Sequence, residues 1–344
     1  MTITAHDRAA GHASAATRAI RILGLAAATV TSVLAASGGA WPDAANWPRS
    51  IAIGTGSPGG IYYGYGEGLG RILTRTLHIE TTAQVTQGPA QNIVLLEKKE
   101  AMLGFVTTGV ALQGWDGTDW AKGTRYRSLR VIFPMYDTAF QFAAPKRLAI
   151  KSLTDLAGLR VGVGPRAGTA GTYVPKIFKL LGITAEIRFG AVEHMTSELA
   201  TGKLDAVAIA SGFPIQPLAE LDVTQPIDLI QLTPEQNAEI RKQLPELTAS
   251  TIPAGTYRSL LQDYSIIGLY NFAIAHKDLA DDLVFKIVKE VFENRDELVK
   301  SQSLAKETIP ANIGRNTMLP LHPGAVRFYR EAGVPLPPGV AVGN

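Results

Sequence analysis

The sequence predicts an α/β fold made of two related halves that face one ligand. From residue 51 onward, apolar strands alternate with amphipathic helices, which is the pattern of α/β proteins. In addition, the order of strand, glycine-rich loop and helix start occurs at residues 51–63 and returns, in altered form, at 161–172, 110 residues further on. Repeats of this length are domain-sized, so each half is expected to form its own lobe.

The first half is expected to open with a short apolar strand and its helix, Ile51–Gly54 and Ile61–Leu77. A second strand, Thr81–Thr86, contains several β-branched residues, which favour strands. A short helix at Gln91–Lys99 follows, and the chain then returns as a strand at Met102–Thr107. This order predicts parallel strands joined by helices.

The second half repeats this plan. Strands are expected at Val161–Gly164, Glu186–Phe189 and Asp205–Ala210, with helices between them at Thr169–Leu181 and His194–Thr201. In both halves the third strand runs into a Thr or Ser followed by a turn glycine. This likeness supports two lobes of one design.

Two connections are expected to join the lobes. The extended apolar run Val131–Ala144 is typical of a crossover strand, and the chain crosses back near Pro253–Tyr257. A strand at Ile266–Ala275 and a helix at Asp281–Glu293 then follow, and five apolar residues of this helix form one stripe, Val284, Ile287, Val288, Val291 and Phe292. We therefore expect lobe 1 to comprise residues 50–138 and 256–344, and lobe 2 to comprise residues 139–255.

The first 40 residues are interpreted as a secretory signal peptide. Three arginines precede an apolar run from Ile22 to Ala36, and small residues follow it, with Ala40 as the expected cleavage point. A transmembrane anchor is the alternative, but the run is shorter than the roughly 20 residues that a membrane span needs. The sequence thus predicts a protein exported to a bacterial periplasm.

Composition excludes several classes of function. Removing residues 1–40 takes away three arginines and one aspartate, so the net charge falls from +3 to +1. A nearly neutral protein gives no electrostatic reason to expect nucleic-acid binding. The sequence contains no cysteine, which excludes disulfides, thiol catalysis and zinc sites that use cysteine.

The two glycine-rich loops are the candidate ligand site. Each loop precedes a helix, and a helix N-terminus can hold an anion through its backbone N–H groups and its dipole. Arg166 is expected to form a fork with a carboxylate, and an arginine that only faces solvent is the equally weighted alternative. Tyr62 is expected to cover an apolar part of the ligand, and packing on its own helix is the alternative. The complete expected set is Thr55, Gly56, Ser57, Tyr62, Thr107, Thr108, Tyr136, Arg166, Gly168, Thr169, Ala170, Thr172, Gly212 and Phe213. No cofactor or metal is expected.

Two enzymatic interpretations have weaker support. Gly54, Gly56 and Gly59 match the spacing of a dinucleotide-binding loop, but no acidic residue ends the second strand, where a ribose would need one. Ser57 resembles the serine of a nucleophile elbow, except that the motif requires glycine where Thr55 stands. A secreted hydrolase using Ser57 therefore remains an alternative only if a histidine lies near it.

Four segments together resemble the TAXI branch of TRAP-transporter solute receptors. They are Gly54–Tyr63, Ile252–Tyr257, Asp281–Lys289 and Leu321–Gly333. The resemblance covers about residues 50–333. It implies a two-lobed periplasmic binding fold of the second type, no catalysis, and a monomeric receptor that delivers a dicarboxylate, keto acid or amino acid such as glutamate to a membrane permease. A sensor that docks on a membrane signalling protein would have the same fold.

The sequence departs from this family at two segments expected to contact ligand. Residues 107–109 are Thr-Thr-Gly where many relatives have Gln-Ser-Asp, and residues 136–138 are Tyr-Asp-Thr where Tyr-x-Glu is common. Both changes reduce the polarity expected for the pocket. They favour a ligand that has no ammonium group.

Overall fold

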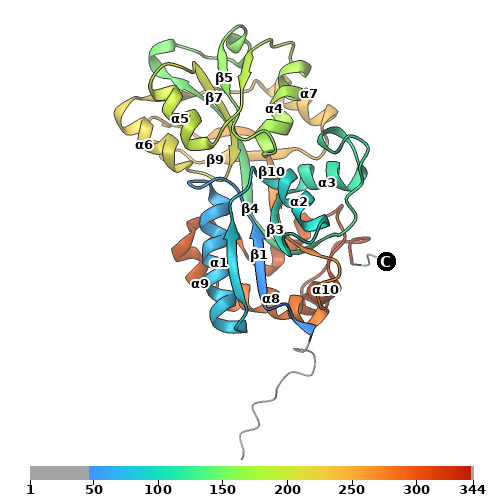
Figure 1. Cartoon of the computed structure of the whole chain (residues 1–344). Coiled ribbons are helices and arrows are strands. Elements are labelled where there is room, and N and C mark those ends of the chain that lie inside the picture. Colours follow the sequence, from blue (N-terminus) through green and yellow to red (C-terminus); the bar gives the residue numbers. More distant parts are fainter. Residues whose placement is uncertain (1–45, 342–344) are drawn as a thin grey trace, which may run out of the picture. The chain divides into compact units, whose positions relative to one another are not determined.

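A ten-stranded mixed sheet organises the computed structural model, which describes residues 46–341 (Figure 1). Its strands follow the order β2-β1-β3-β10-β4-β7-β5-β6, with β9 paired to β10 and β8 paired to β4. Their bounds are β1 Ser50–Gly54, β2 Glu80–Gln84, β3 Leu103–Thr107, β4 Leu129–Pro145, β5 Arg160–Gly162, β6 Glu186–Arg188, β7 Ala206–Ser211, β8 Ile227–Leu229, β9 Thr248–Ile252 and β10 Tyr264–His276.

Helices flank this sheet in both halves (Figure 1). The α-helices are α1 Ile61–Leu77, α2 Pro89–Glu97, α3 Thr108–Asp116, α4 Thr169–Leu180, α5 Val192–Ala200, α6 Gln216–Thr224, α7 Pro234–Gln243, α8 Asp281–Glu293, α9 Arg295–Ser301 and α10 Pro323–Glu331. Short 3₁₀ helices are η2 Asp119–Ala121, η3 Lys146–Leu148, η4 Leu153–Leu156, η5 Ser303–Glu307 and η6 Pro310–Arg315.

The sheet contains two groups of parallel strands, and two long strands connect them. Strands β2, β1 and β3 are parallel to one another, as are β6, β5 and β7. Between the groups, β4 and β10 are antiparallel. Mostly parallel half-sheets joined in this way form the arrangement expected for the type II periplasmic binding fold, and the predicted fold class is confirmed.

Both long strands change partners part of the way along. Strand β4 pairs with β10 from Leu129 to Ala139 and with β7 from Ala139 to Ala143. Strand β10 pairs with β9 up to Gly268 and with β3 from Asn271. A Cβ atom at Gly268 would lie 2.6 Å from the carbonyl oxygen of Thr138. Only glycine fits where the two backbones approach this closely, and both strands change partners near this point.

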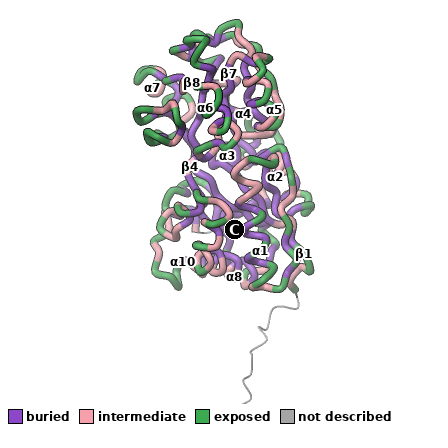
Figure 2. The backbone as a smooth tube through the Cα atoms, turned by 90° about the vertical axis from the view of Figure 1, so that its left-hand side faces the viewer, coloured by how far each residue is buried: buried purple, intermediate pink, exposed green. Residues whose placement is uncertain are grey.

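The core lies along β4 and under the helices. Every residue of β4 is buried except Asp137, and this continuous burial is visible in Figure 2. The predicted stripe of α8 is buried at Val284, Ile287, Val288 and Val291, as expected for an amphipathic helix.

Most of the predicted elements are confirmed. Helices α1 and α8 have the predicted bounds, and the other expected strands and helices of both halves end within two residues of prediction. Helix α2 begins at Pro89, earlier than expected, because proline suits the first position of a helix. Helix α3 was not expected, because its sequence has no marked apolar stripe and contains two glycines. The predicted signal peptide, residues 1–40, lies outside the described residues.

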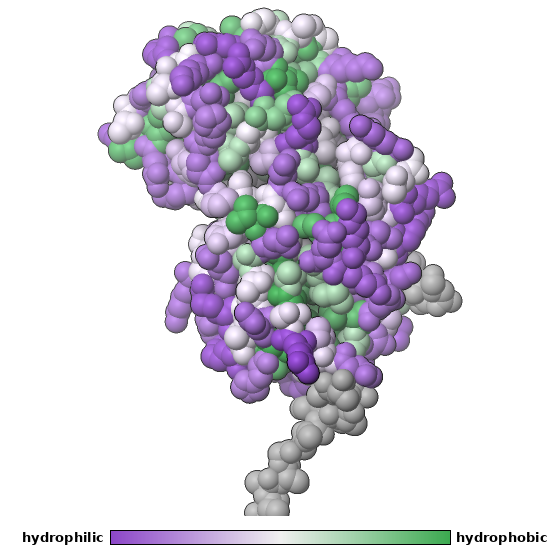
Figure 3. Space-filling model, viewed as in Figure 1, coloured by the Kyte–Doolittle hydropathy of each residue, from purple (hydrophilic) through white to green (hydrophobic). Residues whose placement is uncertain are grey.

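The surface is largely polar on the face drawn in Figure 3, where hydrophobic areas are small and separate. The large hydrophobic side chains that are exposed are far apart in the sequence: Val85, Leu148, Leu180, Val223, Leu261 and Met318. Across residues 46–341, each helix is too short or too polar to cross a bilayer.

His322 is a buried histidine remote from the two glycine-rich loops. Its side chain is fully buried, and its Nδ1 accepts a hydrogen bond from the backbone N–H of Gly324 at 3.2 Å, which caps α10. Burial lowers the pKa of His322 to about 4, and the Asp281 carboxylate only partly opposes this. The folded protein therefore keeps this imidazole neutral.

This histidine should make the protein less stable in mild acid. Its pKa is about 6.5 in the unfolded chain and lower in the folded one, so its contribution is present above pH 6.5 and is lost as pH falls toward 4. We expect a loss of about 2 kcal/mol between pH 7 and 4.5, measured by urea unfolding. His322→Gln should remove most of this loss, whereas His194→Gln, at an exposed histidine, should not. An equal loss in both variants would contradict the assignment.

Candidate functional site

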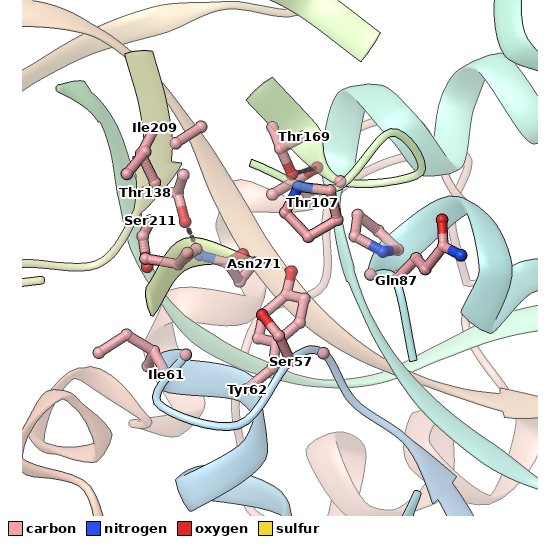
Figure 4. Close-up of a pocket in the computed structure, with 18 of the residues that line it drawn as sticks. Ser57, Ile61, Tyr62, Gln87, Thr107, Thr138, Thr169, Ile209, Ser211 and Asn271 are labelled. Carbon is pink, nitrogen blue, oxygen red and sulfur yellow. Dashed lines mark hydrogen bonds between the residues drawn. The ribbon is translucent and has the colours of Figure 1, made fainter. Parts of the chain in front are cut away.

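A pocket of about 90 Å³ lies at the C-terminal ends of β1, β3, β5 and β7. In α/β sheets, ligands usually bind at this edge. Figure 4 shows how side chains from both halves of the sheet surround it. Ser57 and Tyr62 come from the first glycine-rich loop and the start of α1, Thr169 from the second loop, and Ser211 from the end of β7.

Five helices begin at this pocket. Their N-cap residues are Gly60 for α1, Gly88 for α2, Thr107 for α3, Gly168 for α4 and Ala191 for α5, and each N-cap or the residue after it lines the pocket. In none of these five described helices does an N-cap side chain bond to the first turn. The helix ends therefore direct positive dipoles toward one small space.

The lining is uncharged and combines apolar residues with hydroxyl and amide side chains. Among the described residues that line the pocket there is no Asp, Glu, Lys, Arg or His. The polar groups come from hydroxyl and amide side chains, namely Ser57, Tyr62, Gln87, Thr107, Tyr136, Thr138, Thr169, Ser211 and Asn271. A negative charge placed here would be stabilised by dipoles and hydrogen-bond donors and not by an ion pair.

Asn271 forms the centre of a buried hydrogen-bond network in the pocket. Its Nδ2 donates to the carbonyl oxygen of Tyr136 and to Oγ1 of Thr138, both at 2.6 Å, and its Oδ1 accepts from the Tyr62 hydroxyl at 2.7 Å. The register of β10 against β4 shifts between Tyr270 and Phe272, at this residue. The irregularity thus turns a polar side chain into the pocket.

The two lining tyrosines are neutral. Burial raises the pKa of Tyr62 well above its ordinary value. Burial also raises the pKa of Tyr136, and the neighbouring Tyr62, Tyr65 and Glu307 raise it further. Tyr62 also lies against aromatic rings, 5.6 Å from Phe105 and 6.3 Å from Tyr136 between ring centres. It therefore contributes an apolar ring face as well as a hydroxyl.

Contacts beside the pocket join the second glycine-rich loop to the end of β3 and to the start of α2. The hydroxyls of Thr107 and Thr169 are 3.1 Å apart, as Figure 4 shows. Nearby, the backbone N–H of Ala90 donates to the carbonyl oxygen of Ala167 at 3.1 Å. Gly88 has a φ of +108°, and a Cβ there would lie 3.1 Å from the Cα of Gly168. A side chain at Gly88 would thus be strained as well as crowded.

Asn92 supports the first loop from below. It is fully buried, and its Nδ2 donates to the carbonyl oxygens of Thr55 and Phe105, both at 2.8 Å. Its Oδ1 accepts from the Thr86 hydroxyl at 2.7 Å. One amide therefore ties together the segments that follow β1 and β2 and the end of β3, at the base of the site.

Seven of the residues expected from the sequence line this pocket: Gly56, Ser57, Tyr62, Thr107, Tyr136, Gly168 and Thr169. They come from four separate stretches of the chain. The fold therefore brings the two glycine-rich loops and the end of β3 to one place.

The remaining expected residues do not line it. The hydroxyls of Thr55, Thr108 and Thr172 donate to backbone carbonyl oxygens, respectively those of Gln84, Tyr270 and Thr169. Three further residues, Ala170, Gly212 and Phe213, are also absent from the lining, although Ala170 and Gly212 directly follow lining residues.

Arg166 lies outside the pocket, in an adjoining groove. Its guanidinium is 3.7 Å from the ring centre of Phe189, a cation–π contact, and its side chain is exposed. The groove shares Ser57, Gln87 and Pro165 with the pocket. The guanidinium thus lies in this groove and not in the pocket.

Sequence reasoning missed several lining residues, and three of them left a signal. Asn271 is the one strongly polar residue in the apolar run Ile266–Ala275, and asparagine is uncommon inside strands. Gly88 and Pro89 form a Gly-Pro pair before a helix, which marks a loop that can face a ligand. Ile209 and Ala210 left no signal in the sequence, because the apolar residues of a strand are normally assigned to the core.

The site gives no support for metal or histidine chemistry. Within residues 46–341 there is no group of three or more His, Asp or Glu side chains that could hold a metal. The hydroxyl of Ser57 has no histidine beside it in the lining. His194 has an exposed side chain, and its Nε2 lies 3.5 Å from Oε1 of Glu198.

Comparison with protein families gives a match over most of the described chain. The sequence pattern of the NMT1-like family matches residues 53–333. This stretch contains both glycine-rich loops and all of the strands β2 to β10.

Solved structures with a similar fold include three binding proteins. Tv2483 bound to L-arginine is 15% identical, covering 76% of this chain and 90% of that one, with a TM-score of 0.47. The arginine-, lysine-, histidine-binding protein ArtJ from Geobacillus stearothermophilus is 14% identical (76% and 95% covered, TM-score 0.45). The GluR0 ligand-binding core from Nostoc punctiforme, in complex with L-glutamate, is 15% identical (75% and 99% covered, TM-score 0.45).

The geometry predicts different effects of Thr169 and Arg166 on a ligand held in the pocket. Thr169→Val keeps the side-chain shape but removes a hydroxyl inside the pocket, and it should weaken binding of a small carboxylate such as pyruvate by about tenfold. Arg166→Ala removes an exposed cation outside the lining, and should change the affinity by less than about threefold. Titration calorimetry on the two variants measures both. A larger effect at Arg166 than at Thr169 would mean that the ligand occupies the groove instead.

Proposed function

The chain belongs to the NMT1-like family, and we propose that this protein is a receptor that captures a small organic anion. The observation that carries the proposal is the pocket itself: five helix starts surround about 90 Å³ of space that is lined by hydroxyl and amide groups together with apolar residues. A carboxylate suits this environment, because backbone N–H groups and dipoles can hold it.

The ligand we propose is an acid without an ammonium group, such as a keto acid or a dicarboxylate, in preference to an amino acid such as glutamate. An α-ammonium group usually needs a carboxylate or several acceptors in its site, and no acidic side chain is among the described lining residues. Asp137 lies between two lining residues of β4, but successive side chains of a strand point to opposite faces. Its carboxylate instead accepts from the Ser250 hydroxyl at 2.5 Å.

We further propose that two lobes, 50–138 with 256–344 and 139–255, close over this ligand. The boundary between residues 138 and 139 is supported by the change of partner of β4 at Ala139. Before this residue β4 pairs with β10, and after it β4 pairs with β7 of the other half-sheet. The contacts between Thr107 and Thr169 and between Ala90 and Ala167 are of the kind that closure would form. Closing around the ligand would exclude water and strengthen the few polar contacts.

The cellular role is proposed from the sequence motifs. The segments that resemble TAXI receptors, together with the expected signal peptide, support a periplasmic receptor that works as a monomer and delivers its ligand to the permease of a TRAP transporter. The lining offers no base for a hydrolase built on Ser57, and the receptor is therefore favoured over the enzyme.

A thermal-shift screen of the protein from residue 41 tests the proposal. Acetate, pyruvate, succinate, 2-oxoglutarate, L-glutamate and benzoate form the panel. At a hundredfold excess over its dissociation constant, a true ligand stabilises the folded state by about 2.7 kcal/mol. We expect a clear shift with a keto acid or dicarboxylate and a smaller one with L-glutamate. A preference for L-glutamate would overturn the ligand class, and no shift with any acid would overturn the receptor.

Ser57→Ala separates the receptor from the hydrolase. In a receptor this serine supplies only one of several hydroxyls, so the variant should keep measurable binding, weakened by about fivefold. Neither the wild type nor the variant should hydrolyse ester or amide substrates. Hydrolysis by the wild type that is abolished in the variant would establish the enzyme.

A further inference from the structure

The segment Ile252–Tyr257, conspicuous in the sequence, ends in a tyrosine whose role the pocket lining does not reveal. Tyr257 lies between β9 and β10, and its side chain is 1% exposed. It is not part of the lining. A buried phenol needs hydrogen-bond partners, because an unpaired polar group is costly in the protein interior. The partners of this hydroxyl therefore indicate what it does.

The hydroxyl of Tyr257 connects two parts of the chain. It donates to Oε1 of Gln141 and accepts from the backbone N–H of Ile215 at 2.8 Å. Gln141 is a fully buried amide on β4. Its Nε2 donates to the carbonyl oxygens of Ser211 and Gly212, at 3.3 and 3.5 Å. Tyr257 and Gln141 thus hold residues 211–215 at both ends.

This held segment begins at Ser211, the last residue of the β7 stretch that forms one wall of the pocket. The wall consists of Ile209, Ala210 and Ser211, and residues 212–215 continue the chain directly from it (Figure 4). The backbone at Gly212 is tightly packed: a Cβ there would lie 2.1 Å from Leu304 and 3.1 Å from the ring of Tyr136, itself a lining residue. A displacement of the wall would therefore be transmitted to these neighbours, including the lining residue Tyr136.

We propose that Tyr257 and Gln141 are positioning residues that set the Ser211 wall and thereby determine affinity for the anion. This inference rests on the proposed receptor function. Neither side chain lines the pocket. Without the Tyr257 hydroxyl, the Oε1 of Gln141 and the N–H of Ile215 would lose their shared partner, and the wall could adopt other positions. In a pocket of about 90 Å³, a small displacement of one wall changes the contacts with the ligand.

Tyr257→Phe, with Tyr264→Phe as a matched control, tests the inference. Tyr264 is also fully buried, and its hydroxyl also bonds to the main chain, donating to the carbonyl oxygen of Ile230 at 2.9 Å. Ile230 is not a lining residue. Each substitution removes one buried hydroxyl that bonds to the main chain, and only Tyr257→Phe removes one that holds the wall. The comparison therefore separates a general loss of stability from a displacement of the wall.

The first readout is hydrogen exchange in the absence of ligand, followed by mass spectrometry of peptides that cover residues 209–216. Tyr257→Phe should raise exchange there by about tenfold, and Tyr264→Phe should leave it unchanged, because local opening depends on local contacts. The second readout is pyruvate binding by calorimetry below the unfolding temperature. It should weaken about tenfold in Tyr257→Phe and less than about twofold in the control.

Gln141→Met provides a second variant in case Tyr257→Phe does not fold. It should show the same exchange and binding changes, and the double variant should bind pyruvate no more weakly than either single one, because both residues act through the same wall. Unchanged exchange, or faster exchange with wild-type pyruvate affinity, would overturn the inference. If pyruvate fails to bind even the wild type, pyruvate is not a ligand of this receptor, and the exchange result decides whether Tyr257 holds the wall.

Discussion

The antiparallel pairing of β4 with β10 is the constraint on which the other features depend. These two strands are hydrogen-bonded to each other and to both groups of parallel strands. Because each group is attached to the same pair, the C-terminal ends of β1, β3, β5 and β7 meet around one space. The register shift at Asn271 interrupts this pairing where the pocket needs a polar group. Fold and site therefore share one structural cause.

The strands and helices of both halves could be predicted, because their hydrophobic periodicity is strong and glycine loops separate them. The bounds of α1 and α8 follow from the sequence alone. The weaker elements could not be predicted in this way. Strand β9 and helices α6 and α7 carry little apolar periodicity, and packing against the sheet decides their conformation. Prediction from hydrophobic periodicity fails for short elements of this kind, because they lack a clear repeat of apolar residues.

The candidate site divides in a similar way. The loop residues Ser57 and Thr169 could be found because a glycine-rich loop before a helix has a recognisable sequence. The hydroxyl of Thr55 could not be assigned from the sequence, since its donation to the carbonyl oxygen of Gln84 depends on how β1 and β2 pair. The position of Arg166 depends on its packing against Phe189, which is distant along the chain. A residue's position in a glycine-rich loop therefore indicates contact with the pocket less reliably than the partner that its side chain has in the folded protein.

The uncharged lining has a consequence for the conditions under which capture occurs. A site built on lysine or arginine loses attraction as ionic strength rises, because salt screens exposed charges. Here the attraction comes from fixed helix ends around a small cavity, whose short-range contacts are screened much less. The lining tyrosines stay protonated because burial raises the pKa of Tyr62 and Tyr136. For the acid ligand proposed above, the acidity of the ligand itself would then set the lowest pH at which it is held, and salinity would have little influence on its retention.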